Sequence, residues 1–197
     1  ETRCMKKKEF TELIRLSLIK DVNPLVVDKY VSMAYDSYVQ GYWMSIKGGS
    51  LDVFTKLFEG VEIRNEGKQY YSDLPASLID LPRTGGGVMN IHMIGSMDLT
   101  FVPVTIVGHQ SLNELEVYKL TGPVPFVVTK EKVYYKSIMY GIDKVNMHLL
   151  IKYEEYLPDD NIVFPPNSEM AIRDIVWQFL NQMPPEDKVI DSNEKTN

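Results

Sequence analysis

Cysteine is almost absent from this chain of 197 residues, which contains a single one, Cys4. One cysteine cannot form an intrachain disulfide, so a small secreted fold held together by disulfides is excluded, as is a zinc site made of several thiolates. Cys4 has no histidine near it in the sequence, whereas a reactive thiolate needs a defined electropositive surrounding. We therefore expect no catalytic role for Cys4, and residues 1–4 before Met5 resemble an upstream extension or an expression remnant.

Long hydrophobic runs and an excess of positive charge are also missing. No segment approaches the length of a membrane span, and Lys6–Lys8 leads into an amphipathic segment rather than into the apolar core of a signal peptide. The net charge is −6 with a pI near 5.1, which argues against a general binder of nucleic acids or anionic membranes. We expect a protein that is made and kept in a cytosol, without a membrane partner.

Motifs that carry catalysis or metal binding are missing as well. The histidines His92, His109 and His148 are far apart and form no HxH or HExxH spacing, although they could still converge in space. Gly85–Gly87 runs into a predicted strand and lacks the lysine and hydroxyl residue of a phosphate-binding loop, so it predicts a turn. Gly48–Ser50 fails the same test.

The paired acids Glu154-Glu155 and Asp159-Asp160 flank a short loop and lack the spacing of a calcium-binding loop. There is no Gly-x-Ser-x-Gly elbow. A pair of glycosidase carboxylates need not be close in the chain, so that chemistry stays open at this stage. We predict no catalytic, cofactor-binding or metal-binding residues, no cofactor, and no enzymatic activity.

Helical spacing is present at the start of the chain. Apolar residues recur at helical intervals between Lys6 and Lys20, and Asn23-Pro24 then provides an N-cap followed by a proline at the first helical position. The next helix carries apolar residues at steps of three and four up to Gly48, including four tyrosines: Tyr30, Tyr35, Tyr38 and Tyr42. This stripe is either a core stripe whose hydroxyl groups reach the rim or a contact between subunits.

The middle of the chain reads as β-structure. Leu51–Glu59 is ambiguous between a short helix and a strand, and Asn65–Gly67 predicts a hairpin turn between 61–63 and 69–71. We expect further strands at 88–93, 99–107, 126–129, 132–136 and 146–153, with Lys130-Glu131 at a hairpin tip and a short helix over Ser111–Leu120.

A second region of helix follows Pro165-Pro166. Apolar residues from Ile172 to Met183 form one face, with Trp177 beside it, and Pro184-Pro185 ends the helix. Residues 186–197 are polar and charged, so we expect a flexible tail. The predicted fold is α+β: N-terminal helices (1–49), a central, mostly antiparallel β domain that is sandwich-like or barrel-like (50–164), a C-terminal helix (165–184) and the tail (185–197).

Two Leu-Pro steps interrupt the β region. Tyr70–Pro75 and Ile79–Pro82 are followed by Arg83–Gly87, and proline and glycine at these positions predict a sheet edge or an irregular crossing. Pro75 and Pro82 are therefore candidate partner contacts, together with the four tyrosines and Trp177.

With these features the chain resembles head-to-tail connector (ring or adaptor) proteins of crAss-like and related tailed phages that infect Bacteroidetes. The likeness covers most of residues 6–190, although the family often has Asn/Asp-Gly and Ile where this chain has Arg83–Val88. It rests on the order of these segments: a helical N-terminus, Tyr70–Pro75, Ile79–Pro82, a glycine-bearing turn into Val88–Ile94, Val133–Tyr135, Leu157–Asp160, Pro165-Pro166, the helix 170–183 and an acidic tail.

The resemblance implies a virion structural protein at the head–tail junction, synthesised in the cytoplasm of the host bacterium. It implies a ring of identical copies, about a twelve-fold one, that bridges a portal-like protein and neighbouring connector or tail proteins. Packaged DNA would pass through the channel without specific binding, because acidic walls do not release phosphate counterions. The alternatives are another virion component (capsid-associated or tail-tube), a small hydrolase whose acids are brought together by folding, or a small carbohydrate- or peptide-binding β module that uses exposed tyrosines.

Overall fold

The computed structural model describes residues 3–18, 22–46, 51–67, 69–95, 99–111, 123–136 and 142–182. The helical elements in these ranges are α1 (Lys7–Ser17), α2 (Pro24–Ser45), η1 (Asp52–Phe54), α3 (Ile106–Ser111), η4 (Tyr153–Glu155) and α4 (Ser168–Gln182). The strands are β1 (Arg3–Lys6), β2 (Lys56–Glu62), β3 (Arg64–Glu66), β4 (Gln69–Asp73), β5 (Val88–Met93), β6 (Phe101–Pro103), β7 (Val124–Val128), β8 (Lys132–Tyr135), β9 (Lys144–Leu149) and β10 (Asn161–Phe164).

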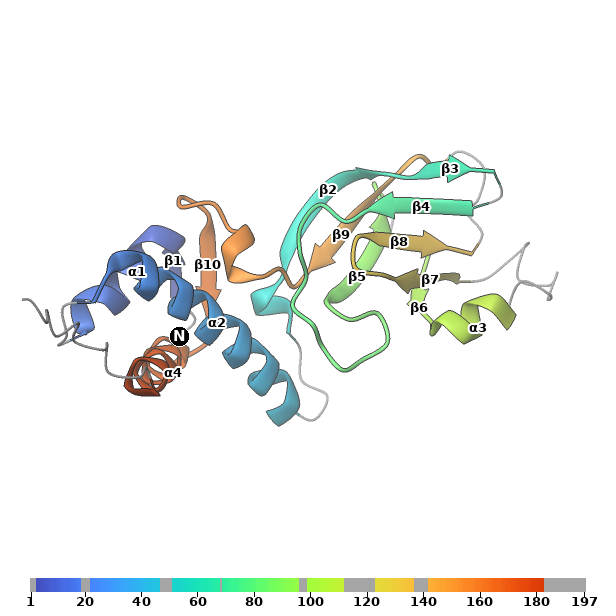
Figure 1. The fold of residues 1–197 in the computed structure, drawn as a ribbon. Coiled ribbons are helices and arrows are strands. Elements are labelled where there is room, and N and C mark those ends of the chain that lie inside the picture. Colours follow the sequence, from blue (N-terminus) through green and yellow to red (C-terminus); the bar gives the residue numbers. More distant parts are fainter. Residues whose placement is uncertain are drawn as a thin grey trace, which may run out of the picture.

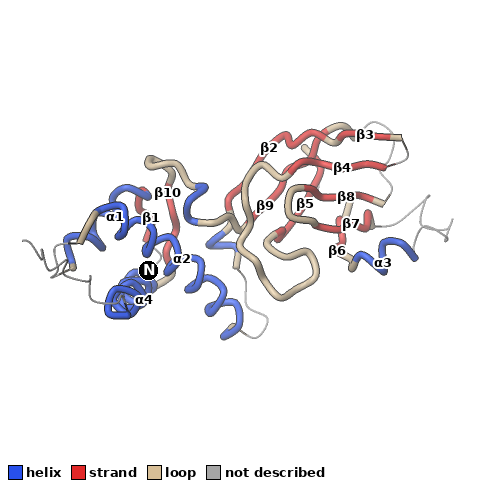
Figure 2. The backbone as a smooth tube through the Cα atoms, viewed as in Figure 1, coloured by secondary structure: helices blue, strands red, loops and turns tan. Residues whose placement is uncertain are grey.

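The molecule is elongated, with helices at one end and sheets at the other (Figure 1). We call β1, α1, α2, β10 and α4 the helical lobe, and β2 to β9 with α3 the sheet lobe. Figure 2 shows most helices in the first lobe and most strands in the second, with β1, β10 and α3 as the exceptions. One hydrophobic cluster nevertheless runs through both lobes, from Phe10 and Ile172 to Val133 and Phe126. The helices and mostly antiparallel sheets confirm the predicted α+β class. The domain boundaries at 49/50 and 164/165 stay predictions.

The sheet lobe contains a three-stranded sheet, β2-β9-β5, and a five-stranded sheet, β3-β4-β8-β7-β6. All their pairings are antiparallel except β6 with β7. Only Ile63 separates β2 from β3, and its N–H donates to Asp143 O at 2.8 Å, so one run of chain joins the two sheets. Among the described strands β5 and β6 are not paired with each other, and the sheets do not close into a barrel.

The start of the chain forms a strand, which the sequence did not predict. β1 pairs with β10 in a two-stranded antiparallel ribbon, in which Met5 lies opposite Ile162 and is buried. Two of the free N–H groups at the start of α1 are also satisfied, because Lys7 N donates to Asp160 O and Lys8 N to Pro158 O. β10 therefore pairs outside the two sheets of the sheet lobe.

The helices follow the predicted patterns closely. Asn23 Oδ1 accepts the N–H of Leu25 at 3.0 Å, and Pro24 occupies the first turn of α2, as the Asn-Pro pair predicted. In α1 the residues Phe10 and Ile14, four positions apart, are fully buried. α4 packs along α2, with Tyr30 and Phe179 at a ring-centroid distance of 5.9 Å. No described helix combines the length and the apolar character that a membrane crossing needs.

Several strand predictions need correction. The expected strand 99–107 is confirmed only over Phe101–Pro103, and the chain then turns into α3. The ambiguous segment 51–59 contains both alternatives, η1 followed by β2. The 65–67 turn is displaced, because β3 pairs with β4 as far as Glu66 and Gln69. Most of the helix expected over 111–120, and the predicted tail, lie outside the described residues.

Candidate interaction surfaces

The tyrosine stripe of α2 mostly faces the interior. Tyr35 is only 1% exposed and packs against the rings of Tyr153 and Phe54, so this residue is a core residue and not a partner contact. Tyr38 and Tyr42 are half-buried and both pack on Phe54, at 6.2 and 5.4 Å. The stripe therefore belongs mainly to the core, while Tyr38 and Tyr42 keep partial contact with solvent.

The other candidate contacts keep accessible surface. Tyr30 and Trp177 are half-buried in the helical lobe, and Pro75 and Pro82 are exposed in the sheet lobe. These side chains lie on different lobes and do not form one continuous patch. They remain candidates for contacts with partners.

The segment with the Leu-Pro steps crosses another part of the chain and is held there by backbone hydrogen bonds. Ile79 N donates to Leu150 O, and Lys152 N donates to Ser77 O, so the segment lies alongside residues 150–152. Gly87 closes the crossing, because its carbonyl oxygen accepts the N–H of Leu150 at 2.8 Å. A Cβ at Gly87 would lie 2.9 Å from Ile79 O and 3.0 Å from Leu150 O. The triple glycine thus allows a close backbone approach, and the turn prediction is confirmed.

A groove of about 910 Å³ lies between this crossing and the β7–β8 hairpin. Its walls combine apolar residues such as Val104 and Val128 with the charged residues Arg83, Lys130 and Glu131. Ile106, at its edge, is 61% exposed. Sequence reasoning missed this groove, because its two walls are about 45 residues apart in the chain.

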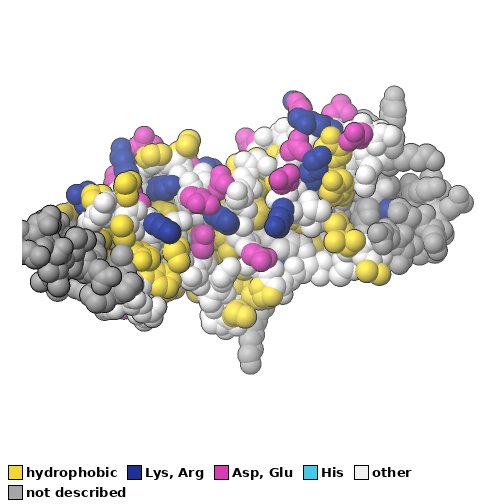
Figure 3. Space-filling view, in the orientation of Figure 1, with side chains coloured by type: hydrophobic (Ala, Val, Ile, Leu, Met, Phe, Trp, Pro, Cys, Tyr) yellow, Lys and Arg dark blue, Asp and Glu magenta, His cyan; other side chains and the backbone are white. Residues whose placement is uncertain are grey.

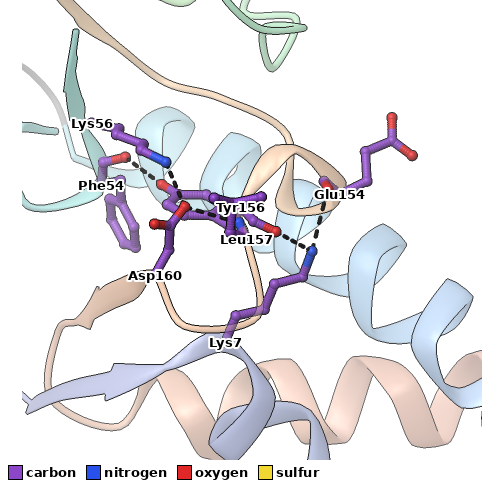
Figure 4. A network of polar contacts seen from close by, with 7 residues as sticks. All are labelled: Lys7, Phe54, Lys56, Glu154, Tyr156, Leu157 and Asp160. Atoms are coloured by element: carbon purple, nitrogen blue, oxygen red, sulfur yellow. Dashed lines mark hydrogen bonds and ion pairs between the residues drawn. The ribbon is translucent and has the colours of Figure 1, made fainter. Parts of the chain in front are cut away.

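A polar network joins α1, η1, β2 and the loop before β10 (Figure 4). Asp160 Oδ2 accepts from Lys56 Nζ at 2.5 Å and from Leu157 N at 2.8 Å, and the hydrogen bond from Lys56 holds the pKa of Asp160 below its usual value. Lys7 Nζ donates to Tyr156 O at 2.6 Å and to Glu154 O at 3.2 Å, while burial lowers the Lys7 pKa. Lys7 and Asp160 each bind backbone groups, and Lys56 pairs with Asp160, so the network is structural.

The paired carboxylates, for which glycosidase chemistry was left open, each contact a different partner. Asp159 pairs with Lys8 at 2.7 Å, whereas Asp160 pairs with Lys56. Glu155 Oε1 accepts the N–H of Ser77, and Glu154 lies 3.9 Å from Lys152.

Two buried tyrosines have hydroxyl groups that stay protonated. Burial raises the pKa values of Tyr135 and Tyr153 well above the ordinary value. Tyr135 donates to Ser72 Oγ at 3.1 Å, and Tyr153 shares a hydrogen bond with Thr11 Oγ1 at 2.9 Å. These groups therefore serve as hydrogen-bonding core residues.

Two of the three histidines come together on neighbouring strands. His92 of β5 and His148 of β9 have ring centroids 5.4 Å apart, and Asn146 Nδ2 lies 3.4 Å from His92 Nε2. The side chain of His109 lies outside the described residues. Within the described ranges no group of three or more His, Cys, Asp or Glu side chains is placed to hold a metal ion.

The outer face of β4 and β8 carries a small aromatic surface. Tyr71 and Tyr134 lie opposite each other with ring centroids 6.0 Å apart, and Lys132 Nζ lies 4.1 Å from the centre of the Tyr71 ring. Asp73, on the same face, pairs with Arg64 at 2.6 Å. Tyrosines with flanking charges are typical of recognition surfaces, but here Lys132 already covers one ring.

Charge is mixed on the face of the molecule that Figure 3 shows. Figure 3 shows basic and acidic side chains interspersed across both lobes, with hydrophobic side chains between them.

Comparison of the chain with family models and with curated proteins finds no match. The chemistry of its surfaces therefore carries the functional argument.

Proposed function

We propose that this protein is a non-enzymatic assembly subunit, a ring or adaptor protein of a phage head-to-tail connector. The proposal has two sources: the resemblance in the order of sequence segments, and two different apolar surfaces on the two lobes. The second is the observation that carries it.

The helical lobe has large apolar side chains exposed to solvent, where they do not contribute to the stability of a free subunit. Leu16 of α1 and Leu25 of α2 are 77% and 76% exposed, and Met170 of α4 is 57% exposed. Leu13 is partly exposed beside Leu16, and a shallow hollow lies beside both. Leu13 and Leu16, which share this hollow, form an exposed apolar site of the kind that another protein covers.

The sheet lobe exposes a second, different set. Ile106 is 61% exposed next to the groove, and Ile94 and Leu57 are 52% and 43% exposed. A subunit with two unlike apolar surfaces on its two lobes suits head-to-tail contacts, in which one surface of each copy meets the other surface of the next. Such contacts form a closed ring when the rotation between copies closes. A ring of this kind would have a portal-like protein on one side and tail components on the other.

The test is the mass of the full chain in solution, measured by native mass spectrometry across a range of concentrations, alone and with a portal-like partner. We expect a closed ring, or a monomer that forms a defined ring with the partner. Leu16→Glu and Ile106→Glu should each abolish the ring, because each buries a charge in an apolar contact. Glu66→Gln, an exposed position in β3 at the opposite edge of the five-stranded sheet from β6, is the matched control and should leave the ring intact.

A chain that stays monomeric under all these conditions would contradict the proposal. The paired tyrosines Tyr71 and Tyr134 would then favour the second candidate function, a small carbohydrate- or peptide-binding module. Binding of glycans or peptides that is lost in Tyr134→Ala would identify it.

A further inference from the structure

Two side chains of helix α2, one helical turn apart, bind the chain segments that follow β4 and β9. Asp36 Oδ1 accepts the N–H of Tyr153 at 3.0 Å, and Gln40 Nε2 donates to Asp80 O at 2.9 Å. Residues at positions i and i+4 lie on the same face of a helix, so the two bonds act side by side.

Both targets belong to one layer of backbone. Residues 77–80 run antiparallel to 150–152, with a bridge between Leu78 and Ile151 and a hydrogen bond from Lys152 N to Ser77 O. Tyr153 follows directly after this layer, and Asp80 ends its other chain. Asp36 and Gln40 therefore fasten the helical lobe to both chains of the layer.

The carboxyl group of Asp36 lies in a largely desolvated position. The groups that act on it are Lys152 and Glu154, on either side of Tyr153, together with the phenol groups of Tyr35 and Tyr156. Lys152 has its ion pair with Glu154, at 3.9 Å. Burial raises the pKa of Asp36 to about 6, against the opposing effects of the Tyr153 N–H and of Lys152.

We propose that Asp36 and Gln40 form a proton-sensitive latch, which holds α2 against the 77–80/150–153 layer more tightly when the Asp36 carboxyl is protonated. The carbonyl oxygen of a neutral carboxyl still accepts the Tyr153 N–H, while the cost of burying a negative charge disappears. This is a regulatory property of the junction between the lobes, and it does not depend on the proposed assembly role.

The direction of the pH effect follows from linkage. The folded state binds the Asp36 proton more tightly than the unfolded state does, because the folded pKa of about 6 exceeds the ordinary value of 3.8. The stabilisation is therefore complete below the ordinary value and is lost as the pH rises through about 6. Asp159 and Asp160 have lowered pKa values and act in the opposite direction, so the effect must be measured as a difference between variants.

The experiment compares the full chain with Asp36→Asn, whose side chain stays neutral and keeps the acceptor for Tyr153. Between pH 7.5 and pH 5.0 the unfolding equilibrium constant of the wild type should fall about tenfold more than that of the variant. Asp28→Asn, on the exposed side of α2, is the matched control and should keep the pH dependence of the wild type. Equal pH dependence of wild type and Asp36→Asn would overturn the proposal.

Two readouts report on the latch itself. The protection factor of the Tyr153 amide should rise on acidification in the wild type and stay constant in Asp36→Asn; a constant wild-type value contradicts the latch. The carboxyl carbon of Asp36, followed by NMR in the wild type, should titrate near pH 6. A midpoint near 4 would refute the proposal even if Asp36→Asn failed to fold.

Discussion

At some positions of this protein, the space between neighbouring backbone segments limits which residue can fit. Gly87 and Gly41 show the contrast, because Gly87 is enclosed by two carbonyl oxygens, whereas nothing lies within 4 Å of a Cβ at Gly41. The first glycine is required by packing, and the second is a weak point near the C-terminal end of α2.

At the residue scale, Gly87→Ala should therefore destabilise the protein by about 1–3 kcal/mol, since the added methyl group meets backbone that cannot move without breaking the Leu150 hydrogen bond. Gly41→Ala should instead stabilise it by about 0.5–1 kcal/mol, because it removes backbone freedom from the unfolded chain and adds a good helix former. Urea unfolding of both variants measures the difference. Equal effects of the two substitutions would show that the crossing is not tightly packed.

Elements are stabilised where their free backbone groups find partners. The N-terminus of α1 relies on carbonyl groups from residues 158–160, so its position depends on the β1–β10 ribbon and its loop. The N-terminus of α2 relies on its own side chain, since Asn23 Oδ1 accepts the Leu25 N–H. A local cap of this kind is visible in the sequence, whereas a cap from a distant loop is not.

At the element scale, Asn23→Ala should lower the free energy of unfolding by about 1 kcal/mol, because the first turn of α2 loses an acceptor. Asn23→Asp is the matched control: it keeps the acceptor and places a negative charge near the positive end of the helix, so stability should be unchanged or slightly higher. Thermal unfolding of the three proteins at neutral pH checks this. A loss of the same size in Asn23→Asp would contradict a capping role.

The whole molecule combines a helical lobe and a sheet lobe that share one hydrophobic cluster. Apolar side chains remain exposed on both lobes, at Leu16 and Leu25 on one and at Ile106 on the other. Exposed apolar side chains contribute to stability only when another molecule covers them. If the chain assembles as proposed, we expect the assembled chain to be more stable than the free chain.

At this scale, deletion of residues 186–197 should weaken assembly more than it lowers the melting temperature, because these residues are polar and charged and have little apolar surface to bury within a subunit. The melting temperature of the truncated chain and its mass with and without a partner are the measurements. Parallel losses in both would place the segment among the folding determinants of the subunit instead.

Features that depend on near neighbours in the chain could be predicted from the sequence. The Asn-Pro start of α2, the helical spacing of α4, the β7–β8 hairpin and the turn at Gly85–Gly87 all follow from local rules of capping, periodicity and turn chemistry. Only the tertiary structure decided which distant segments meet. β1 pairs with β10 and Asp36 meets Tyr153 across more than a hundred residues, and Tyr35 became core because surrounding rings enclosed it. Periodicity identifies the apolar side of an element, but the partner that covers this side depends on how the whole chain packs.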